Sequence, residues 1–214
     1  MQNPTRIVAI RHGETTWNAE KRIQGQLDTP LSALGRWQAE QAGLALRDEV
    51  FHALYASDLE RAFHTAQAIA NHHDLEVIGH TGLRERHFGS FQGLTWDEIQ
   101  ARYPEHSLSW QHRDQWFTPE AGESLAQLRD RVLGAIDAIA SQHEGEQILI
   151  AAHGGVLDVM YRAAHGVATE APRQWELGNA AIHRFLWTPQ ALTLLHWGDT
   201  RHLQDAPPSD EIST

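Results

Sequence analysis

The chain has 214 residues, enough for one α/β domain with a full core, and no cysteine, which excludes disulfides, thiol nucleophiles and zinc–thiolate sites. Its 17 lysines and arginines against 28 aspartates and glutamates give a formal net charge of −11, which argues against general nucleic-acid binding. The start is short and polar and the longest apolar run, Ile148 to Ala152, cannot cross a bilayer, so we expect a soluble cytoplasmic protein without signal peptide or membrane attachment.

Hydrophobic periodicity predicts strands and helices that alternate along the chain. In chain order they are the strand Arg6–Ile10, the helix Ser32–Arg47, the strand Ala53–Ala56, the helix Leu59–His72, the strand Leu75–Ile78, the helix Thr95–Arg102, the helix Glu123–His143, the strand Gln147–Ala152, the helix Gly155–His165 and a hairpin of Ile182–Trp187 with Leu192–Trp197. Ser32 is expected to cap its helix, and Pro104 is expected to end the short one.

This alternation predicts an α/β fold, a three-layer α/β/α sandwich with a mainly parallel central sheet. Residues 1–203 are expected to form a single domain. Residues 204–214 are polar and rich in proline, so we expect a disordered C-terminal tail.

Parallel sheets bind ligands beyond the carboxyl ends of their strands, and two of the predicted strands are followed closely by a histidine and then a glycine. Arg11-His12-Gly13 follows the first strand, and His153-Gly154-Gly155 follows the most apolar strand. Arginine matches phosphate oxygens, neutral imidazole is a nucleophile near pH 7, and the amides that open a helix favour anions. A single His-Gly pair is usually only a turn, but the two junctions together indicate a phosphate site.

The resemblance to a known family then becomes specific. Five motifs in order resemble those of the histidine phosphatase superfamily, also called phosphoglycerate mutase-like proteins. They are Arg11–Asn18 with its continuation Gln24–Ser32, Ser57–Ala66, Leu83–Leu94, Gly122–Ser124 and Ala152–Gly155.

The resemblance implies a role for each matched residue. His12 would be the nucleophile that becomes phosphohistidine, and Glu85 would be the general acid and then the base that activates water. The implied catalytic set is His12, Glu85, His153, Arg11 and Arg61. The implied phosphate- and substrate-binding set is Arg11, Asn18, Gln24, Gly25, Arg61, His153 and Gly154. Neither a metal nor a cofactor is implied, because the arginines would neutralise the phosphoryl oxygens.

Ordinary structural interpretations stand beside these roles. Arg61 could lie on a solvated helix face, and Glu85 could form a surface ion pair with the charges around it. Asn18 and Gln24 could be turn or capping residues. A metal site at His64, His72 and His73 is disfavoured, because no carboxylate sits at ligand spacing.

The superfamily holds both hydrolases and mutases, and two departures from the mutase pattern favour a phosphatase. Residues 153–156 read His-Gly-Gly-Val where cofactor-dependent phosphoglycerate mutases carry His-Gly-Asn-Ser, and residues 107–117 hold one arginine in place of a basic cluster. We therefore expect a metal-independent phosphatase of a small phosphorylated metabolite. A cofactor-dependent phosphoglycerate mutase and a non-catalytic phospho-ligand binding protein are the alternatives, and a homodimer is left open.

The segment from Trp110 to Phe117 follows the acid motif and is rich in aromatic residues. It is expected to form one wall of the substrate cleft and to influence which leaving group is preferred. The alternative is a surface loop that its tryptophans anchor to the core.

Overall fold

The computed structural model describes residues 3–204, which build one six-stranded sheet in the order β3-β2-β4-β1-β5-β6. The strands are β1 (Thr5–Arg11), β2 (Ala53–Ala56), β3 (Val77–Gly79), β4 (Gln147–Ala152), β5 (Ile182–Thr188) and β6 (Ala191–Asp199). The first four are mutually parallel, and β5 and β6 add an antiparallel hairpin beside β1. The predicted mainly parallel sheet and terminal hairpin are confirmed, whereas the predicted tail lies outside the described residues from residue 205 on.

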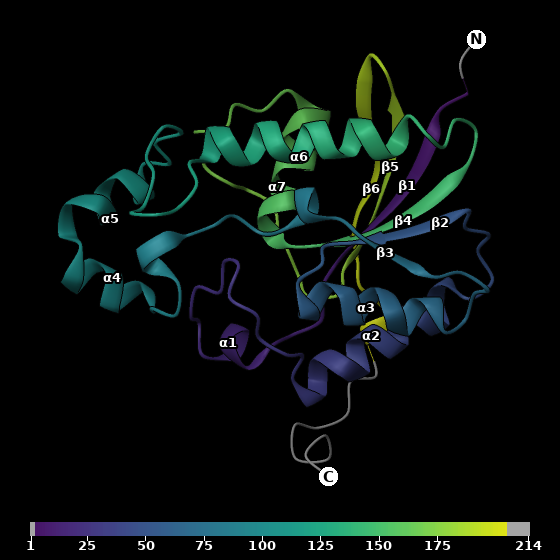
Figure 1. Cartoon of the computed structure of the whole chain (residues 1–214), viewed down its shortest axis with the longest axis horizontal. Coiled ribbons are helices and arrows are strands. Elements are labelled where there is room, and N and C mark those ends of the chain that lie inside the picture. Colours follow the sequence, from purple (N-terminus) through teal and green to yellow (C-terminus); the bar gives the residue numbers. More distant parts are fainter. Residues whose placement is uncertain (1–2, 205–214) are drawn as a thin grey trace.

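Helices cover both faces of the sheet, which confirms the predicted three layers (Figure 1). The helices are α1 (Thr16–Ala19), α2 (Ala33–Leu46), α3 (Glu60–Ala70), α4 (Trp96–Arg102), α5 (Pro104–Gln111), α6 (Leu125–Ala140) and α7 (Gly154–His165). The helices α6 and α7 lie on one face, and α2 and α3 lie on the other. The pair α4 and α5 lies away from the sheet, beyond the start of α6.

The central strands are apolar throughout because both of their faces are buried. In β1, Ile7 and Ala9 belong to the core cluster that α6 and α7 cover, while Val8 and Ile10 belong to the cluster under α2 and α3. A strand covered on both sides shows no polar alternation, which is why Arg6–Ile10 reads as a short continuous run. Burial therefore fixes β1 in the middle of the molecule.

Local signals in the sequence set where several helices begin. The side chain of Ser32 accepts a hydrogen bond from the Gly35 amide, as predicted, and Ser124 caps α6 in a reciprocal capping box with Gln127. The helix α7 ends at His165 and is capped by Gly166, whose φ of 63° is in the left-handed region that glycine tolerates.

The sequence pattern did not predict α5, which carries part of the segment from Trp110 to Phe117. Pro104 does end α4, as predicted, but it also stands at the first position of α5, where its missing N–H costs nothing. Trp110 is therefore a helical residue. The predicted strand Leu75–Ile78 begins two residues later, at Val77.

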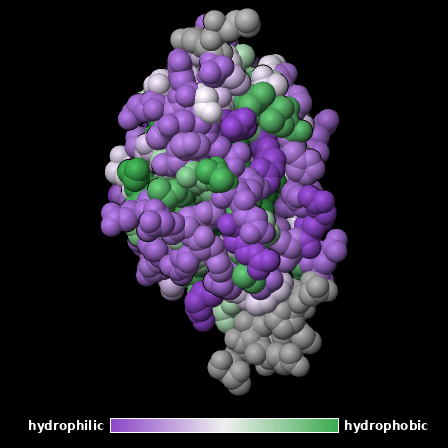
Figure 2. All heavy atoms as spheres, turned by 90° about the vertical axis from the view of Figure 1, so that its right-hand side faces the viewer, coloured by the Kyte–Doolittle hydropathy of each residue, from purple (hydrophilic) through white to green (hydrophobic). Residues whose placement is uncertain are grey.

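One side of the molecule presents a mainly polar surface, in keeping with the composition. Figure 2 shows the side toward which α6 ends and β4 begins, where hydrophilic residues dominate and hydrophobic ones form small separate patches. Within residues 3–204, no helix combines the length and the apolar character that crossing a membrane requires.

Candidate active site

The two histidine–glycine junctions meet because their strands are neighbours. In the parallel pair of β1 and β4, Arg11 is opposite Ala152, so that His12 and His153 leave the sheet side by side. The His12 amide donates to the Ala152 carbonyl at 3.0 Å, and the two imidazole centroids are 5.2 Å apart. Both side chains are buried. This is the arrangement that the carboxyl-end rule predicts.

One ring nitrogen of His12 is engaged in a hydrogen bond, and the other is available to react. Its Nδ1 lies 2.7 Å from the Gly13 carbonyl oxygen, which can only accept, so Nδ1 carries the proton and Nε2 keeps its lone pair. Burial, followed by the charges of Arg11 and Arg61, holds the pKa of His12 well below its usual value. The imidazole is therefore neutral near pH 7, as a nitrogen nucleophile must be.

His153 has no such partner. Among the described residues, neither of its ring nitrogens has a hydrogen-bond partner, although the side chain is fully buried. Burial, and then the nearby Arg61 and His12, lower the pKa of His153 well below its usual value. A dianion bound between the two histidines would raise the pKa of His153, because it stabilises the protonated imidazole. It would also accept hydrogen bonds from the ring nitrogens.

Arg61 lies in the first turn of α3 with only 1% of its surface exposed, so the interpretation as a solvated face residue is wrong. Its Nη1 and Nη2 donate to the carbonyls of Leu27 at 3.0 Å and Gly25 at 2.7 Å. Its Nε has no partner within the described part of the chain, and burial lowers the pKa of Arg61 to about 10. Gly25, one of the predicted binding residues, therefore acts through its carbonyl oxygen, which positions Arg61.

Arg11 is arranged in the same way. It donates from Nη1 to the Leu177 carbonyl, while its buried Nε has no partner in residues 3–204. Burial lowers the pKa of Arg11, and the opposite charge of Glu85 counteracts this. Gly154, the first residue of α7, faces the Arg11 guanidinium, where an added Cβ would make only ordinary contacts. Two buried guanidinium groups with spare donors favour an anionic ligand.

Glu85 belongs to this site and not to a surface ion pair. Its Oε1 accepts from the Arg86 amide at 2.8 Å, and its Oε2 accepts from the Gly155 amide at 3.0 Å. A Cβ at position 155 would lie 2.1 Å from Glu85 Oε1, so this approach requires glycine there. Arg84, the residue before Glu85, forms an ion pair with Asp58 and not with Glu85. The carboxylate therefore rests on the first turn of the helix that begins after His153.

Asn18 is both a capping residue and a member of the site. Its amide oxygen accepts from the Thr15 backbone N–H in the capping box of α1, and it also lies 3.4 Å from the Asn179 side-chain nitrogen. Gln24 accepts from Thr29 through its own amide oxygen. In both side chains the NH₂ group makes no hydrogen bond to a described residue, so it remains able to donate.

Sequence reasoning missed two groups that hold the predicted residues in place. Asn179 donates to the His12 carbonyl at 3.0 Å. Arg131 forms an ion pair with Glu123 and donates to the Glu85 carbonyl, which fixes the loop that carries the acid. Neither residue stands in a motif that carries chemistry, and only the fold brings them to the site.

A cavity of about 460 Å³ begins at Gly155, beside Glu85. It continues between the α4–α5 pair and α7 and is also lined by Arg86, Phe88, Trp96, Trp110, Gln111, Arg113, Leu125, Leu128, Asp158 and Arg173. Trp110 and Arg113 of the segment from Trp110 to Phe117 therefore line this cavity. Trp116 is 72% exposed and does not line the cavity.

The three histidines of the disfavoured metal site have separate surroundings. His72 lies 3.2 Å from a Glu40 oxygen, His64 lies near Glu60, and His73 packs edge-on against Phe51. Residues 3–204 contain no cluster of three or more histidine, aspartate or glutamate side chains arranged to hold a metal ion.

Comparison with known proteins assigns the family. The model of the histidine phosphatase superfamily (branch 1) matches residues 7–200, and the chain belongs to this superfamily. It is 40% identical over 202 residues to the metal-independent phosphoserine phosphatase of Arabidopsis thaliana, covering 93% of this chain and 83% of that protein. It is 39% identical to phosphoglycerate mutase-like protein 4 of the same plant, covering 93% of this chain and 87% of that protein. The structure of Bacillus stearothermophilus YhfR superposes with a TM-score of 0.88 at 29% identity, covering 94% of this chain and all of that one.

Proposed function

We propose that the protein is a metal-independent phosphatase that hydrolyses a small-molecule phosphate monoester through a phosphohistidine on His12. The observation that supports this most strongly is the arrangement around the His12 ring. Its Nε2 is unprotonated, and His153, Arg11 and Arg61 offer nitrogens without protein partners among the described residues. We infer that these nitrogens bind the phosphoryl dianion beside the nucleophile.

The first step forms a bond from His12 Nε2 to phosphorus and breaks the bond from phosphorus to the leaving oxygen. Glu85 in its protonated form gives its proton to that oxygen, so that an alcohol leaves. Arg11, Arg61 and His153 stabilise the charge on the three phosphoryl oxygens in transit. Asn18 and Gln24 donate from their side-chain amides.

The second step uses water. The Glu85 carboxylate takes a proton from a water molecule whose oxygen attacks phosphorus, and the bond from phosphorus to His12 breaks. Inorganic phosphate leaves, and both His12 and Glu85 return to their starting protonation states. The cycle consumes one ester and one water, and it requires no group beyond the side chains of this chain.

The cavity that starts beside Glu85 would receive the alcohol part of the ester. Its lining combines aromatic rings with the guanidinium groups of Arg86, Arg113 and Arg173. Arg86 is stacked near the rings of Phe88 and Trp110, and burial lowers its pKa to about 10. Such a lining suits a small phosphorylated metabolite.

The decisive experiment is phosphate release from a panel of metabolite phosphates with EDTA present. A phosphatase releases inorganic phosphate and needs no primer. A cofactor-dependent mutase would instead interconvert phosphoglycerates after priming with a bisphosphate, and a non-catalytic binder would retain phosphate esters without turnover. Loss of all activity in EDTA with recovery on adding a divalent metal would contradict the proposal.

Three further parts of the proposal need their own measurements. We propose a single folded domain over residues 1–203, which limited proteolysis tests, and cytoplasmic location, which cell fractionation tests. We also propose that the protein forms a homodimer, which light scattering tests.

A further inference from the structure

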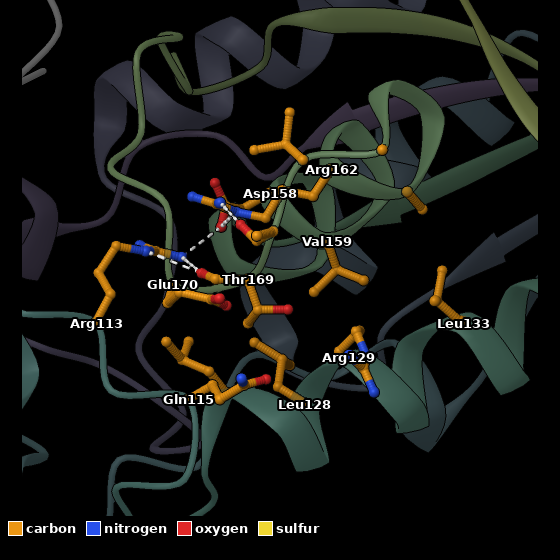
Figure 3. A pocket seen from close by; sticks show the side chains of 15 residues that line it. Arg113, Gln115, Leu128, Arg129, Leu133, Asp158, Val159, Arg162, Thr169 and Glu170 are labelled. Atoms are coloured by element: carbon orange, nitrogen blue, oxygen red, sulfur yellow. Dashed lines mark hydrogen bonds and ion pairs between the residues drawn. The ribbon is translucent and has the colours of Figure 1, made fainter.

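A second cavity of about 410 Å³ lies beside the leaving-group cavity and contains none of the predicted catalytic residues (Figure 3). It is bounded by α6, α7 and the turn after α7. Its lining combines apolar side chains of α6, α7 and the turn after α7 with polar and charged ones, among them Arg129, Arg162 and Glu170. A cavity less than half this size can hold a benzene ring, so there is room for a ring or a branched chain against the apolar part of the lining.

The two cavities share one wall. Four residues line both of them, namely Arg113, Leu125, Leu128 and Asp158. The polar part of this wall is an ion pair in which Arg113 Nη2 lies 3.1 Å from Asp158 Oδ2. The leaving-group cavity therefore ends at Arg113 and Asp158, and the second cavity begins behind them.

The backbone conformation that holds Arg113 across this boundary is strained. Its φ of 52° lies in the left-handed region, which a residue with a side chain rarely adopts. Its guanidinium also donates to the Thr169 carbonyl, at 3.2 Å from Nε and 3.1 Å from Nη2, so it ties the segment after α5 to α7 and the turn that follows α7. Figure 3 shows these bonds at one end of the second cavity.

Asp158 does not depend on Arg113 alone. Its Oδ2 also accepts from Arg162 Nε at 2.8 Å, within α7, and both of these side chains are buried. Removal of the Arg113 side chain would thus leave the carboxylate paired and α7 intact. Asp158 Oδ1 and Arg162 Nη2 already lack partners among the described residues, so opening the ion pair removes one of the two contacts of Oδ2 and leaves the contact with Arg162.

We propose that the Arg113–Asp158 ion pair is a partition that limits the size of the leaving group, and that the cavity behind it is a distal subsite for apolar groups. This inference rests on the proposed function for the location of the leaving group. The ligand class is a phosphate monoester whose alcohol ends in an apolar chain or ring. With the partition closed, short alcohols fit; with it open, the second cavity accepts the distal end of a longer alcohol.

The test is a series of phenylalkyl phosphates of increasing chain length, compared by kcat/KM in the parent and in Arg113→Ala. The ratio of long to short substrates should rise in the variant by about fourfold for each methylene that enters the second cavity. Asp158→Asn removes the charge that holds Arg113 and should shift the ranking in the same direction. The matched control is Arg184→Ala, which breaks a comparable ion pair with Glu49 elsewhere and should leave the ranking unchanged.

A blocking variant separates the subsite from general loosening. Ala163 lines the second cavity and not the first, so Ala163→Phe in the Arg113→Ala background should abolish the gain. An unchanged ranking in Arg113→Ala, or a gain that survives the blocking change, overturns the inference. Binding of the matching phenylalkyl phosphonates gives the same ranking without turnover, so a protein that hydrolyses nothing would refute the proposed function while still deciding this inference.

Discussion

The imidazole rings of His12 and His153 lie 5.2 Å apart because Arg11 and Ala152 are paired in two neighbouring parallel strands. The two rings are therefore positioned by the most deeply buried part of the sheet and not by flexible loops. A rigid support of this kind keeps the nucleophile and its partner in place before a substrate arrives.

The first prediction concerns the covalent intermediate. Brief mixing with substrate carrying labelled phosphate, followed by an alkaline quench, should leave acid-labile label on His12, because phosphohistidine survives base and not acid. His12→Asn should carry no label. Label on any other residue would exclude His12 as the nucleophile.

The second prediction concerns the anion pocket. Arg61→Ala should weaken vanadate binding by about 1.5–3 kcal/mol, the usual contribution of a hydrogen bond to a charged group. Arg61→Lys should recover only part of the affinity, because an ammonium lacks the planar fork that directs separate N–H groups to the two carbonyls and to the ligand. Competitive inhibition of ester hydrolysis measures both. Arg47→Ala, a change on the exposed end of α2, serves as the control, and equal vanadate affinity in Arg61→Ala and the parent would remove Arg61 from the pocket.

The third prediction concerns the proton donor. An alkoxide needs a proton as it leaves, whereas nitrophenolate is already a stable anion, so Glu85→Gln should reduce kcat/KM for alkyl phosphates by roughly 10²–10⁴-fold and for nitrophenyl phosphate far less. The comparison uses kcat/KM or single-turnover rates, because the second step is common to all substrates. An equal loss for both classes would mean that Glu85 only shapes the pocket.

The fourth prediction concerns stability against pH. Because folding lowers the pKa of His153, the unfolded chain takes up a proton that the folded chain does not as the pH falls below about 6.5. The contribution of His153 to the free energy of unfolding is fully present above that pH. At lower pH this contribution decreases by about 1.4 kcal/mol per pH unit. His153→Gln should flatten the profile by that amount in urea melts. Saturating vanadate should do the same in the parent, and an identical slope in parent and variant would contradict the buried neutral imidazole.

The fifth prediction separates two tryptophans of the segment whose role the sequence left open. Trp110 lines the leaving-group cavity and lies 5.3 Å from the Arg86 guanidinium, while Trp116 is exposed. Trp110→Ala should reorder the substrates in a panel of phosphate esters. Trp116→Ala should change neither the order nor the melting temperature. A reordering by Trp116→Ala alone would reverse this assignment.

The strands and both histidine junctions could be predicted from the sequence because their signals are local. A buried parallel strand is a continuous apolar run, and a chain that leaves it through His-Gly carries its motif in adjacent residues. The same holds for the cap at Ser32. The helix α5 was missed because Pro104 satisfies two rules at once, the end of one helix and the start of the next.

The sequence by itself determined the alternation of elements, the order of the motifs and the residue types that phosphoryl transfer needs. Only the tertiary structure decided that Arg61 is buried, that Glu85 rests on the Gly155 amide, that Asn179 holds His12, and that Arg113 pairs with Asp158 between two cavities. The physical reason is that burial and pairing depend on which segments pack together across the fold. A single arginine or asparagine gives the same local sequence pattern whether it lies on a solvated surface or in a buried site.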